Sequence, residues 1–266
     1  MSKIFLKNLL RDNEEGNFYI ASIRREWAKE SLARSNSHEW SKNINPSSNW
    51  LTFEGCPYEG IREAAGARKA NEADTIQYME IGNWVHRGLQ EWAMKVPDLL
   101  WPKPIFPTKK EQDKLEANWP EVPFFWSEYD LSGRIDQIIR YKDAPAVIDI
   151  KSPQRMEGSA WETYKKNLPE PTHMTQSCMG ALALKRMGIL NPEWVGVVYF
   201  NPFIAAKGSA GYFEKYQRFD SLLEEKTMVL LSHAKKEKDA FLAGEESSCS
   251  YLLCKKHRGK LAGEDK

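Results

Sequence analysis

The stretch between residues 132 and 152 constrains the fold of this chain more than any other part. Two β-rich runs, 132–141 and 146–152, are separated by the turn-forming residues Lys-Asp-Ala-Pro. Turn residues between two such runs predict a β-hairpin. A four-residue turn at 142–145 would place Tyr141 opposite Ala146. Counting back from this pair places Asp136 opposite Lys151.

The two faces of the predicted hairpin differ in chemistry. Side chains alternate between the faces of a strand, so Asp136, Asp149 and Lys151 share one face. The other face is the expected core side and carries three isoleucines, Ile139, Ile148 and Ile150. Ile138 is the exception, because it is an apolar residue on the charged face.

The charged face predicts a metal site. Two carboxylates that converge on one point repel each other unless a cation lies between them, and oxygen ligands of this kind suit Mg²⁺ or Mn²⁺. Lys151, two residues after Asp149, would orient or deprotonate a water there and offset phosphate charge. The alternative is a surface face with one Asp–Lys ion pair, which adds little stability. The Gly-Arg-Ile-Asp sequence at hairpin distance favours the metal site.

These motifs resemble those of a known family. Gly133-x-x-Asp136, followed by Asp149-x-Lys151 on the next strand, is similar to the PD-(D/E)XK nuclease superfamily, and within it to the RecB-like branch that includes CRISPR-associated nucleases and phage exonucleases. The resemblance covers roughly residues 48–200. It implies an α/β (mixed) fold with a restriction-endonuclease-like core, a central mixed sheet flanked by helices. It also implies a Mg²⁺- or Mn²⁺-dependent deoxyribonuclease, an exonuclease rather than an endonuclease.

The resemblance adds four site residues to this set. His86, in Gly82-x-x-x-His86, would be a metal ligand, and the backbone carbonyl of Ile150 another. Glu128 matches a glutamate that precedes the first motif, and would bind a second metal or act through water. Gln176 matches a glutamine that opens the following helix, although Gly180 departs from the aromatic residue that often follows four positions later. Without the resemblance, each is an ordinary packed or solvated polar residue.

The cysteines raise the possibility of a second metal site. Some RecB-like nucleases bind an iron–sulfur cluster through one N-terminal cysteine and three C-terminal ones. Cys56 resembles the N-terminal ligand, whereas the C-terminal segment offers only Cys249-x4-Cys254-x2-His257. A mixed iron–sulfur or zinc site with these four residues is one interpretation, and free thiols are the other. Cys178, on the glutamine helix, is expected to be a small buried residue.

Composition excludes several other classes of protein. The sequence is 41% hydrophobic and 28% charged, which is typical of a folded globular protein. The longest apolar run, 194–200, is far shorter than the roughly 20 residues of a membrane-spanning helix. No secretory signal is recognisable, so a cytoplasmic location in a bacterial or phage-infected cell is expected.

The expected helices and strands predict one domain over 1–266, which the resemblance implies is a nuclease domain. It would carry a helical extension at 1–47 and a helical segment at 219–266. Helices are expected near 73–96, 172–187 and 219–242, and strands near 124–131, 133–141, 146–151 and 194–200. Six prolines between residues 97 and 123 predict an irregular connection there.

DNA is the expected partner, in recombination, repair or phage DNA processing. The net charge is only +1, so contacts must come from a local patch. The candidates are Lys109, Lys110, Arg134, Arg155, Lys165 and Lys166. A recombination protein or a single-strand-binding protein is a possible partner. The alternative functions are a non-catalytic DNA-binding subunit of a recombination complex with the same fold, and a nuclease that acts on RNA or on a protein-bound substrate.

Overall fold

A computed structural model describes residues 43–44, 51–53, 55–57, 61, 73–153, 159–201 and 211–245. The chain divides into two units, one of 1–40 with 68–81 and the other of 41–67 with 82–266. Only the beginning of helix α4 (Ala73–Ala93) is described in the first unit. Nearly all of the predicted extension at 1–47 lies outside the described residues, and the single domain stays a prediction.

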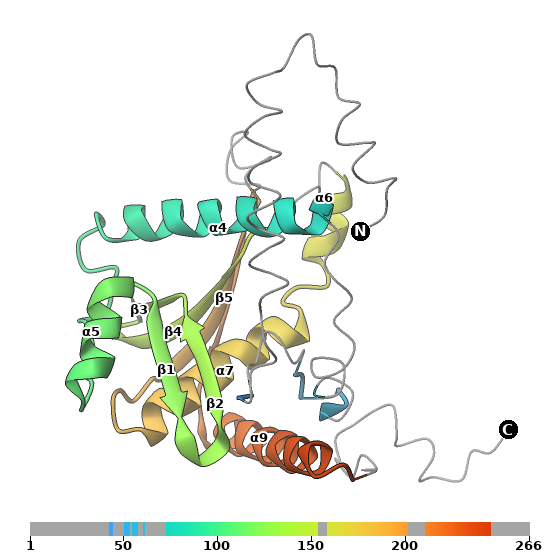
Figure 1. The fold of residues 1–266 in the computed structure, drawn as a ribbon. Coiled ribbons are helices and arrows are strands. Elements are labelled where there is room, and N and C mark those ends of the chain that lie inside the picture. The colour runs from blue at the N-terminus through green and yellow to red at the C-terminus, as the bar shows by residue number, and fades with distance from the viewer. Residues whose placement is uncertain are drawn as a thin grey trace, which may run out of the picture. The chain divides into compact units, whose positions relative to one another are not determined.

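The second unit contains a mixed four-stranded sheet (Figure 1). Its strands, in spatial order, are β3 (Gln137–Tyr141), β4 (Ala144–Lys151), β5 (Trp194–Phe200) and β6 (Tyr212–Arg218). The β4–β5 pair is parallel and the other two pairs are antiparallel. A parallel pair needs a crossover connection, and here it contains α6 (Ser159–Lys165) and α7 (Pro171–Arg186). The predicted mixed α/β fold, with a mixed sheet flanked by helices, is confirmed.

The β3–β4 hairpin has a shorter turn than predicted. Tyr141 pairs with Ala144, so the turn contains only Lys142 and Asp143, both at positive φ (51° and 61°), as a two-residue hairpin turn requires. The four-residue prediction was wrong because Pro145 is part of the strand. Its partner Arg140 donates its backbone N–H to Leu99 O (2.8 Å) instead of to β4. The missing N–H of Pro145 therefore costs no hydrogen bond to β3.

The corrected register changes which residues face each other. Because Gln137 pairs with Ile148, Asp136 falls opposite Asp149, not opposite Lys151. Asp136 itself lies at a bend between β2 and β3. The shift is two residues, so every side chain stays on its predicted face. The sharing of one face by the two aspartates and Lys151 therefore holds.

Both faces of the sheet are buried, which explains the apolar Ile138 on the charged face. Ile138 and Val147 belong to the main core on the side of α7, which packs on β4 and β5. The three predicted core isoleucines lie on the opposite face with Ala146, in a smaller cluster that Leu89 and Leu100 contact. The charged residues therefore lie at the end of a covered face and not on an open one.

A second β-hairpin and helix α9 lie outside the four-stranded sheet. The hairpin consists of β1 (Val122–Trp126) and β2 (Leu131–Ile135), joined through the short helix η1 (Ser127–Tyr129). Helix α9 (Ser221–Leu242) packs against α7 and begins at Asp220, whose side chain accepts from Leu223 N–H. Within the described residues, no helix is long and apolar enough to cross a membrane.

The proline-rich segment predicted to be irregular contains helix α5 (Lys109–Asn118). The Thr108 hydroxyl accepts from Glu111 N–H (3.2 Å) and donates to the Glu111 carboxylate, so Thr108 is the N-cap of the helix. Pro107 precedes this cap and Pro120 follows the helix, so the prolines bound the helix instead of interrupting it. Helix α6 and strand β6 were also not predicted from the sequence.

Candidate active site

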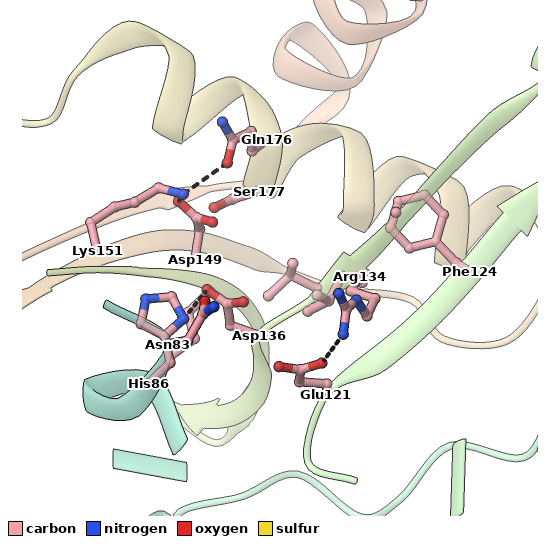
Figure 2. Close-up of a pocket in the computed structure, with 14 residues that line it drawn as sticks. Asn83, His86, Glu121, Phe124, Arg134, Asp136, Asp149, Lys151, Gln176 and Ser177 are labelled. Carbon is pink, nitrogen blue, oxygen red and sulfur yellow. Dashed lines mark hydrogen bonds and ion pairs between the residues drawn. The ribbon is translucent and has the colours of Figure 1, made fainter. Parts of the chain in front are cut away.

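A pocket of about 280 Å³ lies at the C-terminal end of β4, beside α4, α7 and the β1–β2 hairpin (Figure 2). It is lined by residues from all four places: Asn83, His86, Glu121, Phe124, Gly133, Arg134, Ile135, Asp136, Val147, Ile148, Asp149, Lys151, Gln176 and Ser177. The structure therefore brings together five of the seven predicted site residues as pocket-lining groups: His86, Asp136, Asp149, Lys151 and Gln176.

Two buried aspartates form the centre of the pocket. The side chains of Asp136 and Asp149 are only 16% and 14% exposed. Ile150 donates its backbone N–H to Asp136 Oδ2 (2.6 Å), which holds that carboxyl group in place. Burial raises the pKa of both aspartates, that of Asp149 to about 7, although the charge of Lys151 opposes the shift. Without a further cation, the pocket disfavours two ionised carboxylates.

Lys151 connects Asp149 to Gln176. Its ammonium lies 3.0 Å from Asp149 Oδ2 as an ion pair, and it donates a hydrogen bond to Gln176 Oε1 (3.0 Å). Asp149 Oδ2 is buried, and the Lys151 ammonium is the cation that faces it. Gln176 reaches Lys151 from α7, which lies close to β2 because Gly180 has no side chain. A Cβ there would be 2.8 Å from Ile135 Cγ1.

His86 reaches the pocket from α4. Its Nδ1 lies 3.9 Å from Asp136 Oδ2, and Asn83, one turn earlier on the helix, also lines the pocket. Ile150 contributes through its backbone. Because its N–H is directed at Asp136, its carbonyl points to the same side of the strand. The ligand roles of His86 and of the Ile150 carbonyl stay predictions.

The structure does not bring Glu128 to this pocket. Glu128 lies in η1, between β1 and β2, and lines a different pocket with Tyr129 and Lys235. The β1–β2 register, from Val122–Ile135 to Trp126–Leu131, puts Asp136 at the other end of the hairpin. The two ends are four residue steps apart, or about 14 Å.

Glu121, and not Glu128, lies in this pocket beside Asp136. It directly precedes β1, so continuing the register by one residue sets it opposite Asp136. Gln90, which is 6% exposed, lies with its Nε2 3.4 Å from both Glu121 Oε1 and the Asp136 carbonyl. The signal in the sequence is the position of a glutamate at the beginning of the strand that pairs with the Gly-x-x-Asp strand. Using it requires the strand boundaries.

The predicted second metal site falls largely outside the described residues. Cys249, Cys254 and His257 lie beyond residue 245, so the iron–sulfur or zinc site stays a prediction. Cys56 is half-buried. Cys178 is buried in α7, as predicted, and burial raises the pKa of its thiol.

The donor atoms of the pocket suit a hard divalent cation. Among the described residues, no three His, Cys, Asp or Glu side chains are assembled as a ready metal site. The fit rests instead on two facing aspartates whose side chains are only 16% and 14% exposed, and on their raised pKa values. A divalent cation held by these carboxylates would offset the cost of ionising both, and carboxylate oxygens are the ligands that Mg²⁺ and Mn²⁺ prefer.

Comparisons with known proteins give distant structural likenesses. None of the protein-family models matches the chain, and no curated protein does. Among solved structures, it is similar to SSO0001 with 16% identity and a TM-score of 0.42, over 87% of this chain and 93% of that one. It is similar to LHK-Exo in complex with dAMP with 15% identity and a TM-score of 0.41, over 83% and 95%. The alkaline exonuclease LHK-Exo from Laribacter hongkongensis gives 14% and 0.37, over 81% and 97%. Likenesses of this size establish neither family nor activity.

Proposed function

We propose that this protein is a divalent-metal-dependent DNA nuclease. The observation that carries the proposal is the pair of buried aspartates, Asp136 and Asp149, in one pocket with a lysine ion-paired to the second. These residues and their order also match the motifs of the PD-(D/E)XK superfamily. His86 and Glu121 lie beside the pair and would complete a ligand set of oxygen and nitrogen atoms for Mg²⁺ or Mn²⁺.

The side chains that line the pocket would have different roles in phosphodiester hydrolysis. A bound divalent cation supplies Lewis-acid stabilisation of phosphate charge and lowers the pKa of a bound water. Asp136 and Asp149 would hold that cation. Lys151 would orient the attacking water and offset negative charge that develops on the phosphate oxygens. Gln176 would act as a positioning residue, because its carbonyl oxygen accepts from the ammonium (3.0 Å).

An exonuclease acting on DNA in recombination, repair or phage DNA processing is the activity that the resemblance implies. A non-catalytic DNA-binding subunit is the alternative. The presence of both aspartates and the lysine in one pocket favours the enzyme, since a protein that only binds DNA does not need an acidic metal site.

A degradation assay tests this proposal. End-labelled linear and closed circular DNA would be incubated with the protein in Mg²⁺, Mn²⁺ or EDTA, beside an RNA of the same sequence. We expect linear DNA to be degraded with either metal and preserved in EDTA. Cleavage in EDTA would contradict metal dependence, equal rates on circles would contradict exonuclease action, and preference for RNA would contradict the substrate.

The two glutamates near β1 provide a matched pair of variants. Glu121→Gln should raise the Mn²⁺ concentration needed for half-maximal cleavage by about 10-fold or more, because it removes a charge beside Asp136. Glu128→Gln removes the same charge from an exposed turn, and should change that concentration less than about 2-fold. Metal titrations of the two variants compare them directly. The reverse order would show that Glu128 is the ligand after all.

A further inference from the structure

Arg134 is the solvent-facing cation of the pocket. Its side chain is 65% exposed, and its Nη1 donates to Glu121 Oε2 at 3.0 Å (Figure 2). Lys151, the other strongly basic residue among those that line the pocket, is 25% exposed and is held by Asp149 and Gln176. Of these two lining cations, Arg134 is therefore the more accessible to an incoming anion.

The hairpin geometry positions Arg134 next to Glu121. Arg134 pairs with Pro123 across the β1–β2 ladder, and Glu121 is two residues before Pro123. The two side chains are thus diagonal neighbours on one face, a separation that long side chains span. The residue directly opposite, Pro123, is short, and the Arg134 side chain remains 65% exposed.

The ion pair between Arg134 and Glu121 can break at little cost in stability. Glu121 is 24% exposed and Arg134 more so, and ion pairs near solvent contribute little to stability. The pocket also contains three acids, Asp136, Asp149 and Glu121, which repel a phosphate. A guanidinium binds phosphate oxygens in bidentate geometry, so an arginine suits phosphate binding better than a lysine does.

We propose that Arg134 binds a backbone phosphate of the DNA, and that Glu121 holds its guanidinium in the DNA-free protein. The arginine exchanges its carboxylate partner for the phosphate when DNA enters. This inference rests on the proposed function, because it takes DNA as the substrate. It concerns binding rather than chemistry, so it can be tested without metal.

The test is a double-mutant cycle for DNA binding in EDTA. Fluorescence anisotropy of a labelled duplex would be measured over a salt series for wild type, Arg134→Gln, Glu121→Gln and the double variant. Arg134→Gln should weaken binding about 5- to 10-fold and reduce the salt slope of log K by about 0.9, as expected for one lost phosphate contact. Glu121→Gln should tighten binding severalfold in the wild-type background, but much less in the Arg134→Gln background.

Arg186→Gln is the matched control. Arg186 forms a surface ion pair with Glu224 (2.6 Å), which α9 contributes, and it does not line the pocket. Its loss removes the same charge, and should leave the salt slope almost unchanged. Arg134→Lys keeps the charge without the bidentate geometry, and should retain the slope with weaker binding.

The outcomes separate this inference from the proposed function. If Glu121→Gln tightens binding equally in both backgrounds, the effect is general charge repulsion and the exchange is wrong. An unchanged salt slope in Arg134→Gln also overturns it, even if the wild type cleaves DNA. A wild-type protein that binds no DNA overturns both this inference and the proposed function.

Discussion

Asp149→Asn is expected to abolish Mn²⁺ binding and DNA cleavage together. Asp149 faces Asp136 across the corrected hairpin register, and its Oδ2 is buried beside the Lys151 ammonium (3.0 Å). A neutral amide cannot replace an anionic ligand for a hard cation. We expect Mn²⁺ affinity to fall by at least about 100-fold, measured by calorimetric titration beside the degradation assay. Near-normal affinity would remove Asp149 from the site.

The same substitution should stabilise the metal-free protein at alkaline pH. Burial raises the pKa of Asp149 to about 7, above its value in the unfolded chain, so the native state binds more protons between these values. Protonation of Asp149 therefore stabilises the folded protein. This contribution is fully present below the pKa of the aspartate in the unfolded chain, and it is lost as the pH rises through about 7. Asparagine does not titrate.

Thermal unfolding in EDTA measures this second effect. Relative to wild type, the melting temperature of Asp149→Asn should be higher at pH 8.5 by at least about 2–4 °C, the shift that ~1 kcal/mol produces in a chain of this size. The gain should shrink toward pH 5. A variant that melts earlier than wild type at pH 8.5 would contradict the assignment of Asp149 as an unfavourable buried charge.

The sequence predicted which candidate residues share a face better than it predicted the strand pairing around them. Strand 194–200 was predicted with the bounds of β5, and the helix near 172–187 corresponds to α7. Face sharing by Asp136, Asp149 and Lys151 survived a wrong turn length because the register error was two residues. An error of one residue would have placed Asp149 and Lys151 on the face opposite to that of Asp136. Alternation thus carries more information about a site than turn length does.

Glu121 could not be found without the tertiary structure. Both Glu121 and Glu128 precede the Gly-x-x-Asp motif, and only the register of β1 on β2 decides which one meets Asp136. That register depends on where β1 begins, and Pro120 and Pro123 on either side of the boundary predicted irregular structure instead. The ion pair between Glu121 and Arg134 depends on the same pairing.

Lys151→Ala is expected to abolish cleavage while metal binding survives. The Lys151 ammonium lies 3.0 Å from Asp149 Oδ2, so its removal takes a positive charge away from the expected cation and should leave Mn²⁺ affinity equal or higher. The titration should be made at pH 8.5, because Lys151 lowers the pKa of Asp149 and its loss favours a competing proton. Cleavage should fall at least about 100-fold at saturating Mn²⁺, as it does when a preorganised electrostatic group is lost.

Two variants define what this result means. Gln176→Ala removes only the hydrogen bond that holds the ammonium, and should lower the rate less than Lys151→Ala does, without changing Mn²⁺ affinity. Lys185→Ala removes a lysine of α7 that pairs with Glu224 and does not line the pocket, and should leave cleavage intact. Wild-type cleavage by Lys151→Ala would reject the catalytic assignment. Loss of Mn²⁺ binding in that variant would instead show that the lysine holds the two aspartates in place, because a group that acts only on water or phosphate is not needed to bind the metal.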